Sequence, residues 1–454
     1  MNFNSIEFLF LFLPPVLITF HLLYPAWRLA FLTLASCFFY GVSGLIPLTF
    51  MIVSIIWGIA TALVAKRYQT RASTILAISL PLLVLFLFKY LNFTLDTVGA
   101  GAETRDGLSF FLGVTLPAGI SFYTFQIMSY GIDVADGRVD ADRNPIRIAT
   151  YISFFPQLIA GPIVRYEQIR PQLERISTNR WLRPDFRNGL KFLSVGLCAK
   201  IFFADVLGIF HGNRYAVDFL SVATPLDSLF LCLAYSFQIY FDFWAYSLMA
   251  IGLGKLFSIE LPINFREPYL SPNPREFWRR WHVTLSYWLR DYVYVKLGGN
   301  HAYVRNIFIV FAVCGLWHGA GWNFIVWGLY HAVLVTGYKL VERWWNKMPG
   351  PLQIGLTFLL VSFGWPLFFA DVGEYGRILL KMVGYYGAGE GIYGLRHWLY
   401  LFVVALWTFG TREEKWLYNT TRRVVFDWPV VHATAMFVGI IFLSFSTTFI
   451  YFRF

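Results

Sequence analysis

Charged side chains are scarce in this sequence. Asp, Glu, Lys and Arg make up 14% of its 454 residues, whereas hydrophobic residues make up 57% and aromatic residues 20%. A soluble domain carries roughly a quarter of its residues as charges. Apolar runs of about 18 residues or more recur from end to end, and each can cross a bilayer as a helix. The composition therefore excludes an ordinary soluble protein, and the lack of short alternating segments excludes a transmembrane barrel.

Motifs that carry chemistry on their own are also missing. The sequence contains no G-x-S-x-G nucleophile elbow and no Walker phosphate loop, which excludes a serine hydrolase and a P-loop enzyme. Any reacting nucleophile is therefore expected to come from a partner or a substrate. No acid or cysteine recurs beside the histidines at ligand spacing, so we predict no metal and no permanently bound cofactor. Four scattered cysteines are expected to pack in apolar segments: Cys37, Cys198, Cys232 and Cys314.

The long apolar runs are the main feature that is present. They predict an all-α, polytopic helical membrane protein with about 11–13 membrane segments, some of them re-entrant. No internal repeat or low-complexity linker is found, so residues 1–454 are predicted to form a single domain. The predicted segments are approximately 5–24, 28–43, 46–65, 73–91, 108–130, 147–164, 188–210, 227–257, 304–318, 321–341, 352–370, 397–411 and 430–451.

The run 147–164 differs from the others. It contains "FFPQLIAGPI", in which Pro156, Gly161 and Pro162 interrupt a helix. Interrupted backbone at membrane depth is tolerated only beside protein or a water-filled cavity. We therefore expect a half-helix that enters the membrane and returns to the side from which it came.

The net charge of +11 reflects clusters of Lys and Arg between the apolar runs. Such clusters mark cytoplasmic loops, and this explanation is preferred to polyanion binding; no nucleic-acid partner is predicted. With every cluster in the cytosol, the N-terminus and Phe454 are predicted to lie outside. The clusters are Lys66, Arg67 and Arg71; the arginines and Lys191 of 165–191; the arginines and Lys296 of 266–305; and Arg412, Lys415, Arg422 and Arg423.

The stretch 275–300, "REFWRRWHVTLSYWLRDYVYVKLGGN", predicts one helix in the membrane–water boundary. A helical wheel places His282 at the border of an aromatic face and aligns Arg280 with Asp291. Two interpretations remain open: an ordinary interfacial anchor, or a set of cations that binds phosphate at the cytosolic mouth of a cavity. The aromatic face carries Trp278, Trp281, Leu285 and Trp288, and the candidate phosphate-binding cations are Arg279, Arg280, Arg290 and Lys296.

Two of the eight histidines are candidates for chemistry. His282 and His318 each follow a tryptophan, and they are 36 residues apart, whereas His331 lies in an apolar helix where a core hydrogen bond explains it. An ionisable residue inside the membrane is a functional candidate, and desolvation favours the neutral imidazole that can accept a proton. Small residues flank His318, and Asn323 is placed to orient its ring. The residues alone leave two possibilities for His318, a catalytic base or a hydrogen-bonded core histidine.

Several longer segments together resemble the membrane-bound O-acyltransferase (MBOAT) family, and within it the bacterial alginate O-acetylation (AlgI) type. The resemblance runs along most of the chain. Its segments are highly specific together, although no single segment is specific. Its segments are "FLFLFLP" (8–14), "PAGISFYTFQ" (117–126), "FFPQLIAGPIVRY" (154–166), "QIYFDFWAYSLMAIGLGKLF" (238–257), "NFREPY" (264–269), "EFWRRWHVTLSYWLRDYVYVKLGGN" (276–300) and "GLWHGAGWNFIVWGLYH" (315–331).

The resemblance implies a helical membrane domain with a central funnel, in the bacterial inner membrane, that carries an acyl group from a cytosolic thioester to an outer acceptor. It implies that His318 is catalytic, with His282 as the second signature histidine. Acetyl-CoA is then the expected donor, an extracytoplasmic SGNH-type acetyltransferase the expected partner, and an exopolysaccharide such as alginate or cellulose the indirect acceptor. The residues expected to shape or support the pocket are Trp317, Asn323, Asp291, Asp242 and Tyr246.

One segment departs from the family pattern. Members of the alginate type read close to "DFSGYSDMA", whereas this chain reads "DFWAYSLMA", with Trp244, Ala245 and Leu248 at the changed positions. Two alternatives stay open. The first is a D-alanyl transferase of the teichoic-acid type in the same family, which uses a carrier protein as donor. The second is a non-enzymatic transporter or flippase, although the paired charges and repeat symmetry typical of that class are not found.

Overall fold

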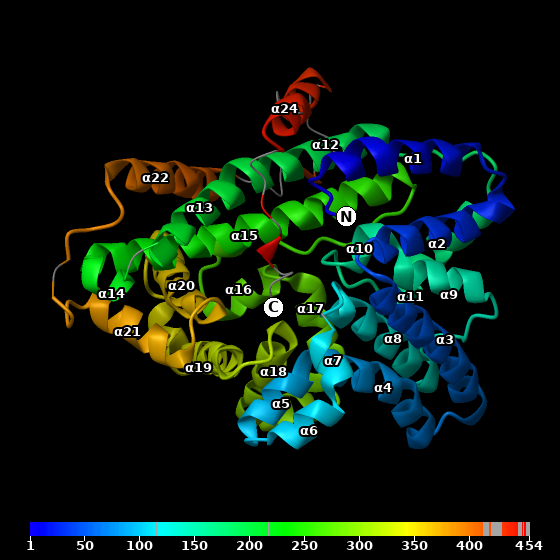
Figure 1. Cartoon of the computed structure of the whole chain (residues 1–454), viewed down its shortest axis with the longest axis horizontal. Helices are drawn as coiled ribbons and strands as arrows, with labels where there is room; N and C mark the ends of the chain where they lie inside the picture. The colour runs from blue at the N-terminus through cyan, green and yellow to red at the C-terminus, as the bar shows by residue number, and fades with distance from the viewer. Residues whose placement is uncertain are drawn as a thin grey trace. The chain divides into compact units, whose positions relative to one another are not determined.

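In the computed structural model, helices follow one another from end to end (Figure 1). The structure describes residues 1–114, 116–216, 218–387, 389–411, 417–418, 429–443, 447 and 449–450, and in these ranges every regular element is helical. The all-α prediction is therefore confirmed. The predicted cytosolic cluster Arg412, Lys415, Arg422 and Arg423 and the terminal residue Phe454 lie outside the described residues.

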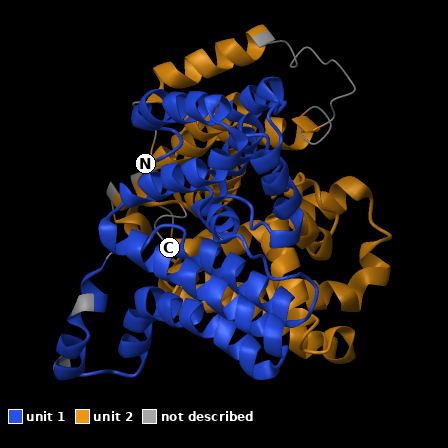
Figure 2. Cartoon of the chain, turned by 90° about the vertical axis from the view of Figure 1, so that its right-hand side faces the viewer, with its two compact units in different colours: residues 1–193, 246–262 blue, residues 194–245, 263–454 orange. Residues whose placement is uncertain are grey.

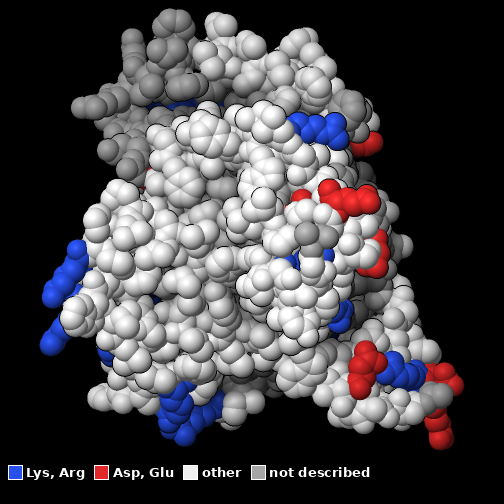
Figure 3. All heavy atoms as spheres, turned by 90° about the vertical axis from the view of Figure 1, so that its left-hand side faces the viewer, with Lys and Arg blue, Asp and Glu red and all other residues white. Residues whose placement is uncertain are grey.

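Five helical stretches are long and apolar enough to cross a membrane, so the chain is a multi-pass membrane protein. Shorter helices also expose apolar faces: Leu399, Phe402 and Leu406 of α22 (Leu395–Gly410) are each more than half exposed. On the face of the molecule beside α21 and α22, charged side chains gather at the margins, and uncharged residues fill the area between them (Figure 3). Such a face suits contact with lipid. The five stretches are Leu45–Tyr68, Arg71–Thr97, Phe186–Gly212, Trp322–Trp345 and Gly350–Phe368.

The chain divides into two compact units, residues 1–193 with 246–262 and residues 194–245 with 263–454 (Figure 2). The helices of the first unit are η1 (Glu7–Phe12), α1 (Leu13–Leu22), α2 (Pro25–Gly41), α3 (Leu45–Tyr68), α4 (Arg71–Leu85), η2 (Phe86–Tyr90), α5 (Leu91–Thr97), α6 (Ala102–Gly107), α7 (Ser109–Gly113), α8 (Ile120–Ala135), α9 (Pro145–Ser153), α10 (Phe155–Leu158) and α11 (Tyr166–Thr178). The boundary between the units falls inside α12 (Phe186–Cys198) and again inside α15 (Pro225–Leu256).

The predicted interruption of the run 147–164 is confirmed in the first unit. After α10 the backbone of 159–164 is irregular, yet these residues are buried. Side chains satisfy part of the backbone around this break: the Tyr151 hydroxyl donates to the Val164 carbonyl oxygen (2.9 Å), and the Gln157 amide donates to the carbonyl oxygen of Tyr151 in α9 (2.5 Å). Protein groups thus replace the water that irregular backbone would otherwise need. Its entry into the membrane stays a prediction.

The predicted continuous run 108–130 is wrong. α7 ends at Gly113, and α8 begins only at Ile120, after a turn in which Gly119 has a left-handed φ of 76°. A Cβ atom on Gly119 would lie 2.4 Å from the Leu158 carbonyl oxygen. The close approach of the α10 backbone, which hydropathy along the chain does not record, therefore requires a glycine and a turn here.

The second unit contains both candidate histidines. Its remaining helices are η3 (Ala199–Asp205), α13 (Val206–Gly212), η4 (Asn213–Ala216), α14 (Phe219–Val222), η5 (Pro268–Leu270), α16 (Pro274–Arg280), α17 (Val283–Leu289), η6 (Arg290–Tyr294), η7 (Gly299–Ala302), α18 (Tyr303–His318), α19 (Trp322–Trp345), α20 (Gly350–Gly364), η8 (Trp365–Phe368), α21 (Val372–Met382), α22 and α24 (Pro429–Ile441).

Glycines bring α18 and α19 into close contact. A Cβ atom on Gly315 would lie 2.2 Å from the Phe324 carbonyl oxygen, and one on Gly328 would lie 2.1 Å from the Phe311 carbonyl oxygen. Small residues let helix backbones approach in this way in membrane proteins. Because His318 ends α18, this contact determines where the histidine lies relative to α19.

Replacing Gly315 by Ala is expected to destabilise the protein by about 1–3 kcal/mol, because the added methyl group meets backbone that cannot move aside cheaply. The melting temperature of the purified variant in detergent measures this effect. Gly337→Ala in α19 is the matched control, since its Cβ would meet nothing within 4 Å. Equal melting temperatures for the two variants would contradict the proposed backbone contact.

Candidate active site

The segment around His282 is a broken helix, so the single interfacial helix predicted over 275–300 is wrong. α16 ends at Arg280, α17 begins at Val283, and His282 between them has a left-handed φ of 43°. Non-glycine residues adopt this conformation rarely, and tertiary contacts must hold it. Because of this break, a single helical wheel does not describe 275–300. Trp281 and Trp288, which the wheel placed on a face toward the lipid headgroups, are buried, with exposed fractions of 0% and 4%. These tryptophans pack in the protein core and do not lie in the lipid headgroups.

Asn264 holds the ring of His282. Its Oδ1 atom lies 3.0 Å from His282 Nδ1 and accepts a hydrogen bond from the Thr284 hydroxyl at 2.9 Å. Since Oδ1 is only an acceptor, Nδ1 carries the proton of the neutral ring and Nε2 presents its lone pair. Burial lowers the pKa of His282 to about 3, which keeps the ring neutral. Asn264 lies inside the quoted "NFREPY" segment, but nothing in its local sequence marks it as a partner of a histidine.

His318 is the last residue of α18 and is 3% exposed. Its ring lies 6.4 Å from the ring of His282, measured between centroids. The fold therefore brings together two histidines that are 36 residues apart in sequence. Aromatic rings pack against the pair: Trp317 lies 4.9 Å from His318 and 5.5 Å from His282, Trp327 and Phe368 lie 5.0 and 5.3 Å from His318, and Phe243 lies 4.7 Å from His282, measured between ring centroids.

The predicted supporting residues occupy different places. Trp317 contacts both histidines, as just described. The Asn323 amide donates to the Leu367 carbonyl oxygen (2.8 Å), so it ties the start of α19 to η8, beside Phe368. Asp291 lies 2.6 Å from Arg290, as an ion pair. Asp242 accepts hydrogen bonds from Lys200 and from the Ile450 backbone N–H, and Tyr246, in the other unit, stacks on Phe3.

His331 is a core histidine, in agreement with the sequence. It is fully buried in α19, and the Trp278 indole N–H lies 3.3 Å from its Nδ1 atom. Trp278 also packs on Trp327, with ring centroids 5.7 Å apart. His331 therefore packs against Trp278 and Trp327, and Trp327 in turn contacts His318.

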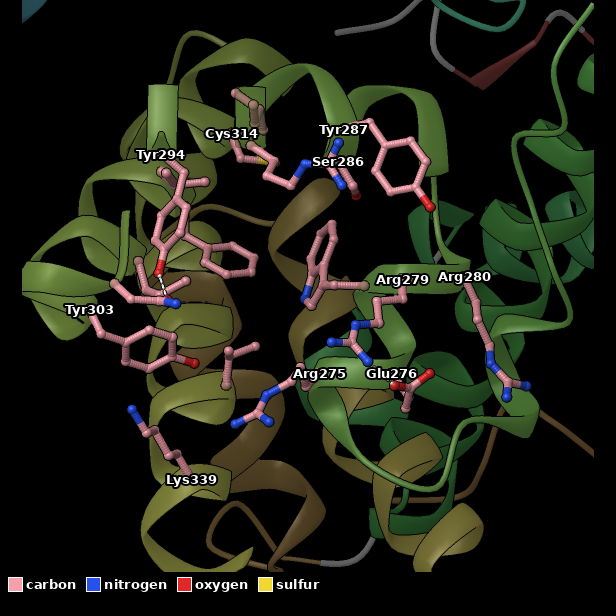
Figure 4. A pocket seen from close by; sticks show the side chains of 18 of the residues that line it. Arg275, Glu276, Arg279, Arg280, Ser286, Tyr287, Tyr294, Tyr303, Cys314 and Lys339 are labelled. Atoms are coloured by element: carbon pink, nitrogen blue, oxygen red, sulfur yellow. Dashed lines mark hydrogen bonds and ion pairs between the residues drawn. The ribbon is translucent and has the colours of Figure 1, made fainter. Parts of the chain in front are cut away.

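A cavity of about 1270 Å³ in the second unit is lined by residues of α16, α17, η6, α18 and α19 (Figure 4). Three of the four predicted phosphate-binding cations, Arg279, Arg280 and Arg290, line it, whereas Lys296 is exposed and is not a lining residue. The other basic lining residues were not among the predicted phosphate-binding cations: Arg266 and Arg275 belong to the predicted cytoplasmic cluster of 266–305, and Lys339 comes from α19. The charged lining residues are Arg266, Arg275, Arg279, Arg280, Arg290 and Lys339, with Glu267 and Glu276 as the carboxylates.

The excess of basic side chains over carboxylates makes this cavity attractive to anions. Glu276 partly compensates Arg279 at 2.5 Å, and the Arg275–Glu342 distance is longer, 3.7 Å. Lys339 lies 4.0 Å from the centre of the Tyr303 ring. In Figure 4, Arg275, Arg279 and Lys339 lie toward one end of the cavity, and Ser286 and Cys314 lie toward the other.

The end of the cavity marked by Ser286 and Cys314 approaches both histidines. Ser286 is one helical turn from His282, whose carbonyl oxygen accepts the Ser286 N–H at 3.0 Å. Cys314, which is buried, is one turn before His318 on α18. The cavity therefore extends to within one turn of each histidine, although neither ring lines it.

Comparisons with known proteins show the class of this membrane protein. A model of the membrane-bound O-acyltransferase family matches residues 137–353. The chain belongs to this family, which confirms the resemblance seen in the sequence, and it is an enzyme of the acyltransferase class.

Relatives of several named activities share most of this chain. It is 39% identical over 383 residues to the Pseudomonas syringae pv. tomato protein named "Probable alginate O-acetylase AlgI", covering 81% of this chain and 72% of that protein. It is 35% identical over 430 residues to a Helicobacter pylori peptidoglycan O-acetyltransferase, with 85% and 80% covered. A Bacillus subtilis teichoic acid D-alanyltransferase is 32% identical over 272 residues, with 55% and 68% covered.

Proposed function

We propose that this protein is a membrane O-acetyltransferase that moves an acetyl group from cytosolic acetyl-CoA to an extracytoplasmic hydroxyl. The observation that carries the proposal is the histidine pair together with a basic cavity whose lining includes Ser286 and Cys314, each one helical turn along the chain from a histidine of the pair. The named O-acetylating relatives support acetyl as the group, and they match more of the chain than the D-alanyl transferase does. O-acetylation of an exopolysaccharide of the alginate or cellulose type is the proposed outcome.

In the proposed reaction, the phosphates of acetyl-CoA bind the arginines of the cavity, and the thioester arm reaches past Ser286 and Cys314 toward His318. The neutral His318 imidazole takes the proton of the acceptor hydroxyl, and the oxygen attacks the thioester carbonyl carbon. The carbon–sulfur bond breaks, the acetyl ester forms, and the leaving thiolate takes the proton back from the imidazolium. The hydrogen bond to Asn264 fixes the tautomer and orientation of His282 beside His318. Trp317 contacts both rings and shapes the space between them.

The proposed setting follows the charge distribution and the composition. The protein would lie in a bacterial inner membrane with its N-terminus outside and its basic cavity facing the cytosol. The acceptor hydroxyl would belong to the serine of an extracytoplasmic SGNH-type acetyltransferase, which would pass the acetyl group to the polymer. A direct transfer to the polymer is the other route through the same site.

Purified protein in liposomes, supplied with ¹⁴C-acetyl-CoA on the cavity side, is expected to release CoA and to transfer label to an SGNH partner or to an alginate oligosaccharide outside. Empty liposomes are the control. A parallel reaction with a D-alanyl carrier protein as the donor tests the main alternative. Transfer from the carrier protein but not from acetyl-CoA would contradict the proposal and would assign the protein to the D-alanyl branch.

A further inference from the structure

Three buried ionisable groups of the second unit take no part in the proposed chemistry. Lys200 Nζ lies 2.7 Å from Asp205 Oδ1 and 2.6 Å from Asp242 Oδ1. All three side chains are 3% exposed. Buried charges are expensive in a membrane protein, and those that persist are paired and usually have a function. We call Lys200, Asp205 and Asp242 the buried triad.

The buried triad holds residues near the end of the chain. One ammonium group cannot neutralise two carboxylates, and further donors come from Thr447 and Ile450. The Thr447 hydroxyl donates to Asp205 Oδ1 at 2.6 Å, and the Ile450 N–H donates to Asp242 Oδ2 at 2.6 Å. The triad therefore binds Thr447 and Ile450, which complete its hydrogen bonding. Phe449 precedes Ile450, and Thr447, Phe449 and Ile450 are here called the tail residues.

The tail residues contact the environment of His282 through two aromatic rings. The Phe449 ring lies 5.9 Å from that of Phe243, the residue after Asp242. The Phe243 ring in turn meets His282 edge-on, with centroids 4.7 Å apart and an interplanar angle of 90°. Phe243 and His282 are both fully buried. A contiguous path thus leads from the buried triad through the tail residues to the candidate site.

We propose that the buried triad fixes the tail residues against Phe243 and thereby positions His282. Lys200, Asp205 and Asp242 are then positioning residues that act through Phe449 and Phe243 and do not touch the substrates. Their effect on catalysis rests on the proposed function, whereas the fixing of His282 does not. Trp244 and Ala245, where this chain departs from the alginate-type pattern, directly follow Phe243 in the sequence. The departure therefore lies beside the residues that position His282.

The physical basis is the packing of Phe243. Its ring contacts those of Phe449, Phe265 and His282, and a side chain packed by several neighbours keeps one rotamer. If the tail residues leave, Phe243 loses one packing surface and a route for water opens toward His282. The His282 ring then keeps its bond to Asn264 but loses the edge contact that limits its rotation about that bond. A small misplacement of such a group lowers the rate of a transfer reaction strongly.

Two variants of the full-length protein in liposomes test the proposal. Phe449→Ala removes the ring that covers Phe243, and Asp242→Asn weakens the hold on the tail residues. Phe442→Ala is the matched control, because Phe442 packs on Phe202 at 5.5 Å. The first measurement is the carbethoxylation of His282 by diethyl pyrocarbonate, read by mass spectrometry. The second is the split between kcat and the KM for acetyl-CoA.

Both test variants are expected to react about tenfold faster at His282 and to lose about tenfold in kcat, with KM within about twofold of the unaltered protein. The control is expected to match the unaltered protein in every measurement. Unchanged carbethoxylation and kcat in Phe449→Ala would overturn the proposal, as would equal changes in Phe442→Ala. If carbethoxylation rises but the unaltered protein transfers no acetyl group, the proposed function fails and the positioning of His282 stands.

Discussion

Replacing His318 by Ala is expected to lower acetyl transfer by about 10²–10⁴-fold, the usual contribution of a general acid–base group. In the proposed reaction the neutral His318 imidazole accepts the hydroxyl proton and returns it to the thiolate. Gln and Asn should not replace His318, because a side-chain amide does not take up a proton as a neutral imidazole does. Single-turnover transfer of ¹⁴C-acetyl from acetyl-CoA measures the loss.

The control for this prediction is a second buried histidine in the same unit. His432 in α24 lies 3.5 Å from the Ser194 hydroxyl, and it contacts neither His282 nor His318 in the described part of the chain. His432→Ala therefore removes a buried imidazole without touching the proposed chemistry, and it should retain the rate. Both variants should reach the membrane in the same amount. Retained transfer in His318→Ala would remove the proposed base and leave His318 as a packing residue.

Changing Arg279 and Arg280 together to Gln is expected to raise the KM for acetyl-CoA by about 10–100-fold with little change in kcat. Hydrogen bonds to charged groups contribute about 1.5–3 kcal/mol each, and solvent exposure reduces that contribution here. The expected split follows because phosphate contacts hold the donor equally well before and during the reaction. The KM should also rise with salt concentration in the unaltered protein, since ions screen exposed charges.

The matched control removes two exposed arginines elsewhere. Arg183 and Arg187 belong to the first unit and are exposed, so Arg183→Gln with Arg187→Gln changes the net charge equally without altering the cavity. This control should leave the KM for acetyl-CoA unchanged. If the two double variants behave alike, Arg279 and Arg280 serve only to anchor α16 and the donor binds elsewhere.

Local sequence was sufficient for some parts of the site. His318 was recognisable because an ionisable side chain in a run of glycines and tryptophans is costly unless it is used. Arg279, Arg280 and Arg290 were recognisable because clustered guanidinium groups suit phosphate. Lys200 carried the same signal, since it lies in an apolar run, but its partners Asp205 and Asp242 are meaningful only once α15 and η3 pack together.

Other parts depended on contacts that a helical wheel cannot contain. The wheel over 275–300 assumed continuous helix, whereas Asn264 and Thr284 hold His282 in a left-handed conformation. Arg275 and Lys339 line the cavity only because α16 and α19 face it. In each case the decisive partner is far away in sequence, and side-chain periodicity records only neighbours on one helix.

The sequence by itself determined that this protein is helical and crosses a membrane many times. In lipid, the backbone can satisfy its hydrogen bonds in few structures other than helices. Long apolar runs separated by Pro and Gly therefore predict membrane helices directly. Packing in the folded chain places His282 at a helix break, brings its ring within 6.4 Å of the His318 ring, and gathers the arginines around one cavity. These choices arise from packing between distant segments, where a single backbone approach or buried hydrogen bond outweighs local preference.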